Sequence, residues 1–253
     1  MRSFRPVTLL AAALVAAPLA GASAQPVPPL PNINWSFSGL FGTFDRASAQ
    51  RGFQIYNEVC SNCHGLKHAF YRDLSGIGLT EEQIKIVAAS KKIPMLSDEG
   101  QATERPGLPS DHFRAPYPND GVARLVNGGA LPPDLSVITK GREGGPDYVY
   151  GILTGYQNPP TGFNLTRGKY YNAYFPGHQI SMPQMLQSDT VTYVDGTKAT
   201  ADQEARDVVT FLEFIANPEM EQRKRMGVKV VLFLLLLTGL SYSVKRKLWS
   251  NLH

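Results

Sequence analysis

The chain has 253 residues, of which 43% are hydrophobic, and it carries a formal net charge of +4. Most of the excess positive charge lies at the two ends, because the stretch from Gln25 to Pro218 holds 16 basic and 19 acidic residues. This central part is mildly acidic, so the composition gives no support to nucleic-acid binding. An acidic face of this kind can steer a basic protein partner.

The N-terminus has the three parts of a secretory signal. Arg2 and Arg5 precede an apolar run over residues 7–19, and Ala22-Ser23-Ala24 is a small-residue cleavage site. The run is shorter than the ~20 residues that span a membrane. We therefore predict that residues 1–24 are a signal peptide, removed on export, and that the mature chain begins at Gln25.

The two cysteines of the chain lie together in Cys60-Ser61-Asn62-Cys63-His64. This C-x-x-C-H spacing is the attachment site of a c-type haem, with the two thiols bound to the porphyrin and the histidine on the iron. A zinc site would need further thiols or histidines at short spacing, and none are present. A redox dithiol would follow a strand, whereas residues 47–58 predict a short helix. We expect one covalent haem c on Cys60 and Cys63, with His64 as an axial ligand.

The segment over residues 25–222 predicts a single loop-rich domain. Pro and Gly interrupt it repeatedly, and short helices are expected at 80–89, 120–127 and 146–154. An alternating stretch at 192–197 closes on Asp195-Gly196 and predicts a small hairpin. A capping-box pattern at Thr200 then starts a helix that ends before Pro218, with one apolar stripe made of Val208, Phe211, Leu212 and Ile215. The predicted fold is mainly α: a class I cytochrome c-like haem domain with long loops and a small hairpin.

An electron-transfer haem needs a second axial ligand from the protein. The candidates are Met95, Met182, Met185, Met220, Met226, His68, His112 and His178. Met220 and Met226 lie next to the C-terminal apolar segment, and His68 follows His64 so closely that it falls on the same side of the ring. Met182 and Met185 lie in a Pro-containing loop far along the chain, as a strap over the other face of the haem should. Physical reasoning alone does not exclude Met95 or decide between Met182 and Met185.

Residues 226–244 form a second hydrophobic segment, long enough to cross the hydrocarbon core as a helix. Basic residues bracket both of its ends, which favours a membrane span over a buried core helix. Arg223, Lys224 and Arg225 precede the span, and three basic residues follow it, so the charges do not fix its orientation. Thioether haem attachment takes place outside the bacterial inner membrane. We therefore expect a periplasmic haem domain, a single transmembrane anchor and a cytoplasmic tail at 245–253.

Several motifs resemble one family of haem proteins. They are the stretch from Arg51 to His64, Tyr71-Arg72-Asp73-Leu74, Arg105-Pro106-Gly107, Pro116-Tyr117-Pro118-Asn119, Ala123-Arg124, the stretch from Gly129 to Ser136, Tyr174-Phe175-Pro176-Gly177, Ile180-Ser181-Met182 and Lys247-Leu248-Trp249. Together they are similar to the cytochrome c1 family, the c-type haem subunits of ubiquinol:cytochrome c oxidoreductases. The resemblance implies that Met182 is the distal haem ligand and that Arg124 lies near a haem propionate. The residues Met182-Pro183-Gln184-Met185-Leu186 depart from the family's more usual Met-Ala-Pro-Pro-Leu.

The resemblance also implies a function and a set of partners. Such a subunit takes an electron from a Rieske iron–sulfur protein and passes it to a soluble cytochrome c, beside a cytochrome b subunit in a dimeric complex of the respiratory chain. The chain alone would catalyse no bond chemistry. Two alternatives remain: a free membrane-anchored shuttle cytochrome that serves a terminal oxidase, and a five-coordinate haem sensor or peroxidase.

Overall fold

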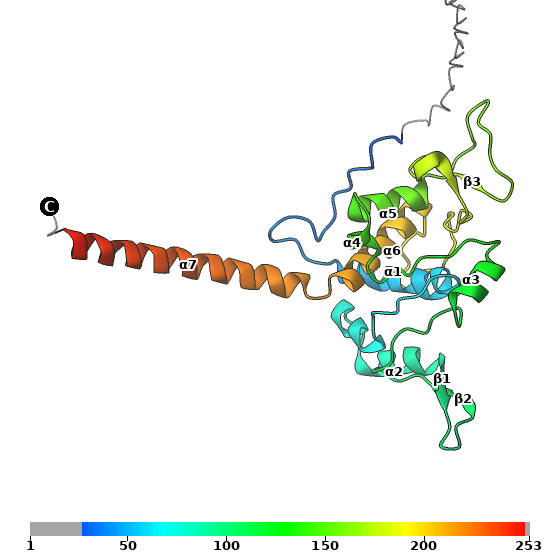
Figure 1. Ribbon diagram of the computed structural model, residues 1–253, viewed down its shortest axis with the longest axis horizontal. Coiled ribbons are helices and arrows are strands. Elements are labelled where there is room, and N and C mark those ends of the chain that lie inside the picture. The colour runs from blue at the N-terminus through cyan, green and yellow to red at the C-terminus, as the bar shows by residue number, and fades with distance from the viewer. Residues whose placement is uncertain (1–26, 251–253) are drawn as a thin grey trace, which may run out of the picture.

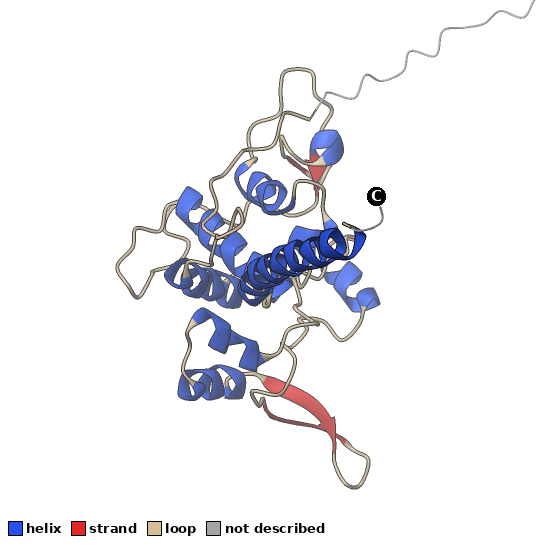
Figure 2. Cartoon of the chain, turned by 90° about the vertical axis from the view of Figure 1, so that its left-hand side faces the viewer, coloured by secondary structure: helices blue, strands red, loops and turns tan. Residues whose placement is uncertain are grey.

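The structure, a computed structural model, describes residues 27–250 (Figure 1). The predicted signal peptide and the last three residues of the tail lie outside the described residues. A cluster of short helices and loops forms one body, and a single long helix leaves it (Figure 1). Figure 2 looks along this long helix and shows the short helices grouped around its base.

Two helices form the centre of the body. α1 (Arg46–Glu58) begins after Asp45, whose side chain accepts a hydrogen bond from the Ser48 N–H, and α6 (Ala201–Ala216) packs across it. The two helices meet at Gly52, where a Cβ atom would lie 1.9 Å from the carbonyl oxygen of Asp207. Only glycine allows this approach. Most of α6 is buried, on a wider face than the single stripe predicted from the sequence.

The remaining short helices surround this pair. α5 (Gly145–Thr154) packs on α6 and on α4 (Ile138–Gly141), and α2 (Glu81–Ala89) packs on η2 (Tyr71–Ile77). The loops carry α3 (Asp120–Val126), η1 (Cys60–Asn62) and η3 (Pro176–His178). The helices predicted near 80–89, 120–127, 146–154 and after Thr200 are all present.

Two antiparallel hairpins are present in the described part of the chain. β1 (Lys92–Leu96) pairs with β2 (Ala102–Pro106), and β3 (Tyr170–Tyr171) pairs with β4 (Gln179–Ile180). The hairpin predicted at 192–197 is wrong, because only its turn forms, with the Gly196 N–H 3.2 Å from the Tyr193 carbonyl. The segment pairs with α1 instead of with itself: Arg51 binds Asp195 at 2.9 Å, and Gln54 donates to the Thr192 carbonyl at 3.0 Å.

Aromatic side chains fill much of the core between α1, α6 and the N-terminal segment. Trp35 stacks on Phe37 with ring centroids 5.4 Å apart, and Phe53 contacts Phe211 at 5.5 Å. Tyr56 and Tyr71 are almost fully buried around Phe113. These rings bury a large apolar area without a disulfide.

The long helix α7 (Met220–Trp249) contains the predicted span at 226–244 and extends beyond it in both directions. Its first turns belong to the domain: Met220 is buried, and Glu221 accepts hydrogen bonds from the Phe44 N–H and from Arg46, each at 2.8 Å. Its apolar stretch has a mean hydropathy of 1.9 and is not buried. Among residues 27–250, α7 is the one helix long and apolar enough to cross a membrane.

Candidate haem site

The two cysteines and the histidine lie on one compact turn after α1. The N–H groups of Cys63 and His64 both donate to the carbonyl of Cys60, at 3.1 and 2.9 Å. Both cysteines are half-buried and neither is in a disulfide. The turn therefore offers two thiols and an imidazole at neighbouring positions, as covalent attachment of a porphyrin requires.

His64 has one ring nitrogen already engaged. Its Nδ1 lies 2.7 Å from the carbonyl oxygen of Pro133. A carbonyl only accepts hydrogen bonds, so Nδ1 carries the proton and the lone pair of the ring is on Nε2. Burial lowers the pKa of His64 and favours the neutral imidazole. This is the protonation state and orientation that an iron ligand needs.

A second segment, residues 131–136, holds this turn in place, and we call it the 131–136 clamp. The Leu135 N–H donates to the Gly65 carbonyl at 2.9 Å, and the Asp134 carboxylate accepts from the Lys67 N–H at 2.9 Å. The Ser136 hydroxyl accepts from the His68 N–H at 3.1 Å. The role of the clamp was not predicted from the sequence. Its only signal there was the family-like stretch from Gly129 to Ser136.

The same turn does not suit the other uses of a C-x-x-C motif. Burial raises the pKa of the Cys60 thiol to about 12, and the nearby Cys63 adds to the rise. A redox dithiol needs a readily formed thiolate, which this environment disfavours. Within residues 27–250, no group of three or more His, Cys, Asp or Glu side chains is arranged to hold a metal ion. The residues present therefore fit a thioether-bound haem better than a dithiol or zinc centre.

Met182 follows β4 in a loop that is fixed at several points. The Tyr156 hydroxyl donates to the Met182 carbonyl at 2.9 Å. The buried Asn172 donates to the Ile152 carbonyl at 2.8 Å and thereby ties the β3–β4 hairpin to α5. Met182 itself is half-buried. A strap held this firmly can present a thioether without large movement.

The other candidate axial ligands have different surroundings. Met95 and Met185 are exposed, Met220 is buried where α7 meets the domain, and Met226 is on the exposed part of α7. Among the histidines, His68 and His112 are exposed, whereas His178 is buried against the Tyr171 ring. Of the methionines described, Met182 alone is half-buried, as a side chain at the edge of a cofactor site should be.

Arg124 is exposed on α3, and its guanidinium donates to the Gly129 carbonyl at 3.2 Å. It therefore lies on the stretch of chain that leads into the 131–136 clamp. The C-terminal end of α1, α3 and the β3–β4 hairpin all lie on the side of the domain opposite α7 (Figure 1). The candidate haem residues thus come from elements gathered at the end of the domain that lies away from the long helix.

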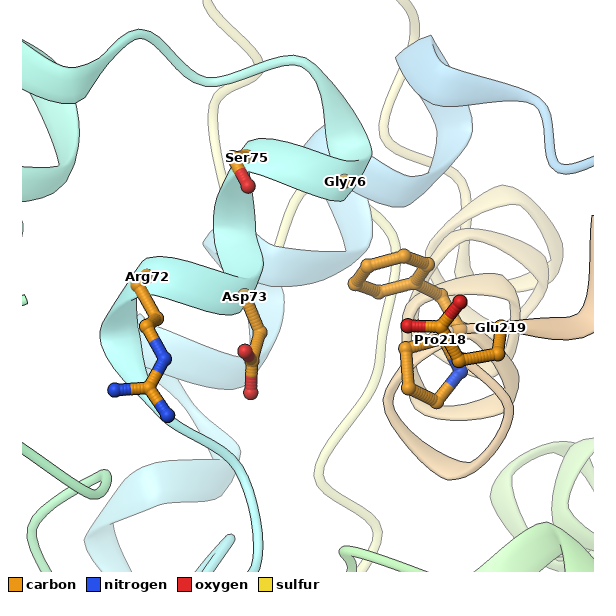
Figure 3. Close-up of a pocket in the computed structure, with 7 residues that line it drawn as sticks. Arg72, Asp73, Ser75, Gly76, Pro218 and Glu219 are labelled. Carbon is orange, nitrogen blue, oxygen red and sulfur yellow. The ribbon is translucent and has the colours of Figure 1, made fainter. Parts of the chain in front are cut away.

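A hollow lies elsewhere in the described part of the chain. It measures about 320 Å³ and is lined by Arg72, Asp73, Ser75, Gly76, Phe214, Pro218 and Glu219. Figure 3 shows η2 on one side of it and the junction of α6 and α7 on the other. None of the candidate haem residues lines it.

The sequence matches a known protein family and several of its members. The Cytochrome C1 family profile matches residues 35–252. "Cytochrome c1" of Rhodospirillum rubrum is 45% identical over 235 residues, which cover 86% of this chain and 86% of that protein. "Cytochrome c1 1, heme protein, mitochondrial" of Arabidopsis thaliana is 47% identical over 224 residues, which cover 88% of this chain and 73% of that protein. "Cytochrome b/c1" of Bradyrhizobium diazoefficiens is 44% identical over 246 residues, which cover 88% of this chain and 36% of that protein. The resemblance seen in the motifs is confirmed, and the chain belongs to the Cytochrome C1 family.

Proposed function

We propose that the chain carries one haem c bound through Cys60 and Cys63, with His64 and Met182 as the two axial ligands. The observation that carries this proposal is the 2.7 Å contact between His64 Nδ1 and the Pro133 carbonyl, which leaves Nε2 for the iron. Membership of the Cytochrome C1 family makes the chain a c-type haem protein and a membrane-anchored electron-transfer subunit of a quinol:cytochrome c oxidoreductase.

The haem, when bound, accepts and releases one electron at a time. The chain's own residues hold and tune it. His64, oriented by the 131–136 clamp, and Met182 would hold the iron, and a thioether ligand would favour the reduced iron and raise its reduction potential. Arg124 would balance the charge of a propionate. If His64 and Met182 both hold the iron, no site would remain on it for a substrate, and the chain would do no bond chemistry by itself.

We infer that the electron comes from a Rieske iron–sulfur protein and leaves to a soluble cytochrome c. A cytochrome b subunit is the expected membrane partner, and the assembly is expected to be dimeric. The name of the Bradyrhizobium relative joins b and c1 in one longer protein, which supports a partnership with cytochrome b. The acidic balance of the domain suits a basic electron acceptor.

The chain is a single-pass membrane protein, with α7 as its span. We propose that residues 1–24 are cleaved, that residues 25–222 form a haem domain in the periplasm and that residues 245–253 lie in the cytoplasm of a bacterial cell. The basic residues on the two sides of α7 are balanced and do not set its orientation. The orientation is supported instead by haem attachment, which takes place outside the bacterial inner membrane.

The attachment is tested on a denaturing gel stained for haem peroxidase activity. We expect a stained band at the mature mass, lost or strongly weakened in Cys60→Ala and in Cys63→Ala. Ser61→Ala is the matched control, because it alters the same turn without removing a thiol. Release of haem on denaturation of the unaltered protein would contradict covalent attachment.

The place in the complex is tested by gentle solubilisation and purification through a tag on this chain. Cytochrome b and the Rieske protein should co-purify with it. Purification of the chain alone would favour a free shuttle cytochrome, and ready binding of carbon monoxide by the reduced haem would favour a five-coordinate sensor or peroxidase.

A further inference from the structure

A short apolar loop lies beside the start of α7. It consists of residues 38–43, and we call it the 38–43 loop. Leu40 and Phe41 at its tip are 62% and 80% exposed. The large side chains on either side of the loop, Phe37 and Phe44, are buried in the core. The loop thus presents two large apolar side chains to the outside from a well-packed base.

The base of the 38–43 loop is firmly held. The Thr43 N–H donates to the Ser36 carbonyl at 3.1 Å, closing the loop on itself. A Cβ atom on Gly42 would lie 2.0 Å from the Ser38 carbonyl oxygen, so this close return requires glycine. The Lys224 ammonium donates to the carbonyls of Phe37 and Gly42, at 2.7 and 3.1 Å. Exposure of the tip is therefore built into the fold.

The contact with Lys224 fixes the loop relative to the membrane span. Lys224 lies in the first turns of α7, before the apolar stretch that starts at Val230. Figure 1 shows the loop projecting from the domain on the side from which α7 leaves, alongside the first part of that helix. When α7 crosses a bilayer, the tip of the loop faces the same membrane surface.

The charges around the neck of α7 suit the same surface. Arg223, Arg225 and Lys229 are exposed on the first turns of the helix. Basic side chains that lie just before a membrane span are level with the phosphates of the lipid headgroups. Apolar side chains slightly deeper enter the region between headgroups and acyl chains. On a water-facing surface an exposed Leu-Phe pair brings no stability, whereas at a membrane interface the pair is buried in lipid.

We propose that the 38–43 loop is a second membrane contact, in which Leu40 and Phe41 insert into the lipid interface beside α7. A single helix would leave the domain free to swing about its neck, and a second contact limits that motion. The loop thereby sets the inclination of the haem domain to the membrane plane. This role is independent of which residues ligate the haem.

The insertion is tested by tryptophan fluorescence of the full chain in vesicles of zwitterionic and anionic phospholipids. Phe41→Trp is placed in a Trp249→Phe background, and the background protein supplies the signal of the buried Trp35. Emission is compared between vesicles with plain and with brominated acyl chains, so that quenching by haem cancels in the ratio. We expect blue-shifted emission and at least a twofold bromine quench, strongest for bromines close to the headgroup.

Leu96→Trp in the same background is the matched control, because Leu96 is 68% exposed on the β1–β2 hairpin, away from α7. It should emit as in water and show no bromine quench. Water-like emission from the Phe41→Trp variant without quenching would overturn the proposal. Blue-shifted emission without quenching would also overturn it, since the loop would then lie against protein.

The orienting role has a separate readout. Linear dichroism of the haem in aligned membranes reports the spread of haem orientations. Leu40→Ser with Phe41→Ser removes the apolar tip without touching the core, and should broaden that spread while the haem spectrum stays unchanged. An unchanged spread would show that the loop does not orient the domain.

Discussion

The Nδ1 atom of His64 and the carbonyl oxygen of Pro133 lie 2.7 Å apart, although 69 positions separate the two residues in the chain. The contact depends on the 131–136 clamp, whose backbone and side chains bind the residues that follow His64. A hydrogen bond from Nδ1 to a carbonyl makes the imidazole a stronger electron donor. The clamp is therefore expected to influence both the orientation of the ring and the potential of the proposed haem.

Asp134→Ala tests this influence. Loss of the carboxylate frees the Lys67 and Ser136 N–H groups that it now binds, at 2.9 and 3.0 Å. We expect a looser clamp, a weaker hydrogen bond from His64 and a higher midpoint potential in a redox titration. Lys67→Ala is the matched control, since Lys67 contributes its backbone N–H, and it should leave the potential in place. Equal potentials in both variants and the unaltered protein would contradict this role of the clamp.

Met182→Leu tests the distal ligand. Leucine keeps the volume and the apolar character, at a packing cost below about 1.5 kcal/mol, so the variant separates ligation from packing. We expect the Met–ferric charge-transfer band to disappear and the potential to fall far enough to stop turnover of the complex, with the haem still attached. Met185→Leu is the matched control and should keep both. If Met185→Leu removes the band and Met182→Leu does not, the ligand assignment is wrong.

The elements that the sequence predicted well are those fixed by local signals. Thr80 and Gln83 form both hydrogen bonds of a capping box, so the start of α2 is visible in four residues. The apolar run at 226–244 is likewise a local property, and it lies within α7. Its extension to Met220 was not predicted, because it depends on contacts of Glu221 and Lys224 with residues far earlier in the chain.

Contacts between distant segments explain what the sequence did not reveal. The stretch at 192–197 alternates like a hairpin, but Asp195 binds Arg51 of α1, so the segment pairs with a helix. The β1–β2 hairpin was missed because its strands are largely exposed and Pro94 lies within β1. For the haem site, the C-x-x-C-H run identified the turn, but nothing local to it points to Pro133.

Truncation separates the anchor from the domain. Deletion from Met226 onward keeps Met220, Glu221 and Lys224, all of which contact the domain. We expect a soluble product with an unchanged haem spectrum. Deletion from Glu219 onward removes those contacts and should lower the melting temperature by several degrees, since burying Met220 alone contributes about 2 kcal/mol. Loss of haem from the longer fragment would mean that the membrane span is part of the haem fold.

Asp207 is the centre of a buried ionic cluster between α1 and α6. Its carboxylate is fully buried and accepts hydrogen bonds from Arg51 at 2.8 and 3.0 Å and from Ser48 at 2.6 Å. Asp207→Ala leaves the largely buried guanidinium without its main partner, and we expect a loss of about 3 kcal/mol in unfolding free energy. Asp195→Ala removes the more exposed partner of the same arginine and should cost less than about 1 kcal/mol. Denaturant unfolding of the two variants measures both values, and equal losses would contradict the difference in burial.

An ion pair between Arg105 and Asp111 holds the β1–β2 hairpin against the domain through two hydrogen bonds of 2.7 Å each. The Arg105 guanidinium, together with the Leu108 N–H, lowers the pKa of Asp111 to about 2, whereas the ordinary value is 3.8. A carboxyl whose pKa is lowered by folding stabilises the fold above its ordinary pKa, and this stabilisation is lost as the pH falls through the lowered value. The Arg105–Asp111 ion pair should therefore hold the hairpin at neutral pH and break between about pH 4 and pH 2.

Hydrogen exchange of the hairpin amides, compared between the unaltered protein and Asp111→Asn, measures this opening. The comparison cancels the effect of pH on the intrinsic exchange rate. We expect faster exchange in Asp111→Asn at pH 7, because the neutral amide binds the guanidinium weakly, and a difference that shrinks toward zero as the pH falls to about 2. A difference that stays constant over this range would show that the Asp111 charge does not hold the hairpin. High salt at pH 7 should reduce the difference as well, since this pair is partly exposed and its attraction is screened.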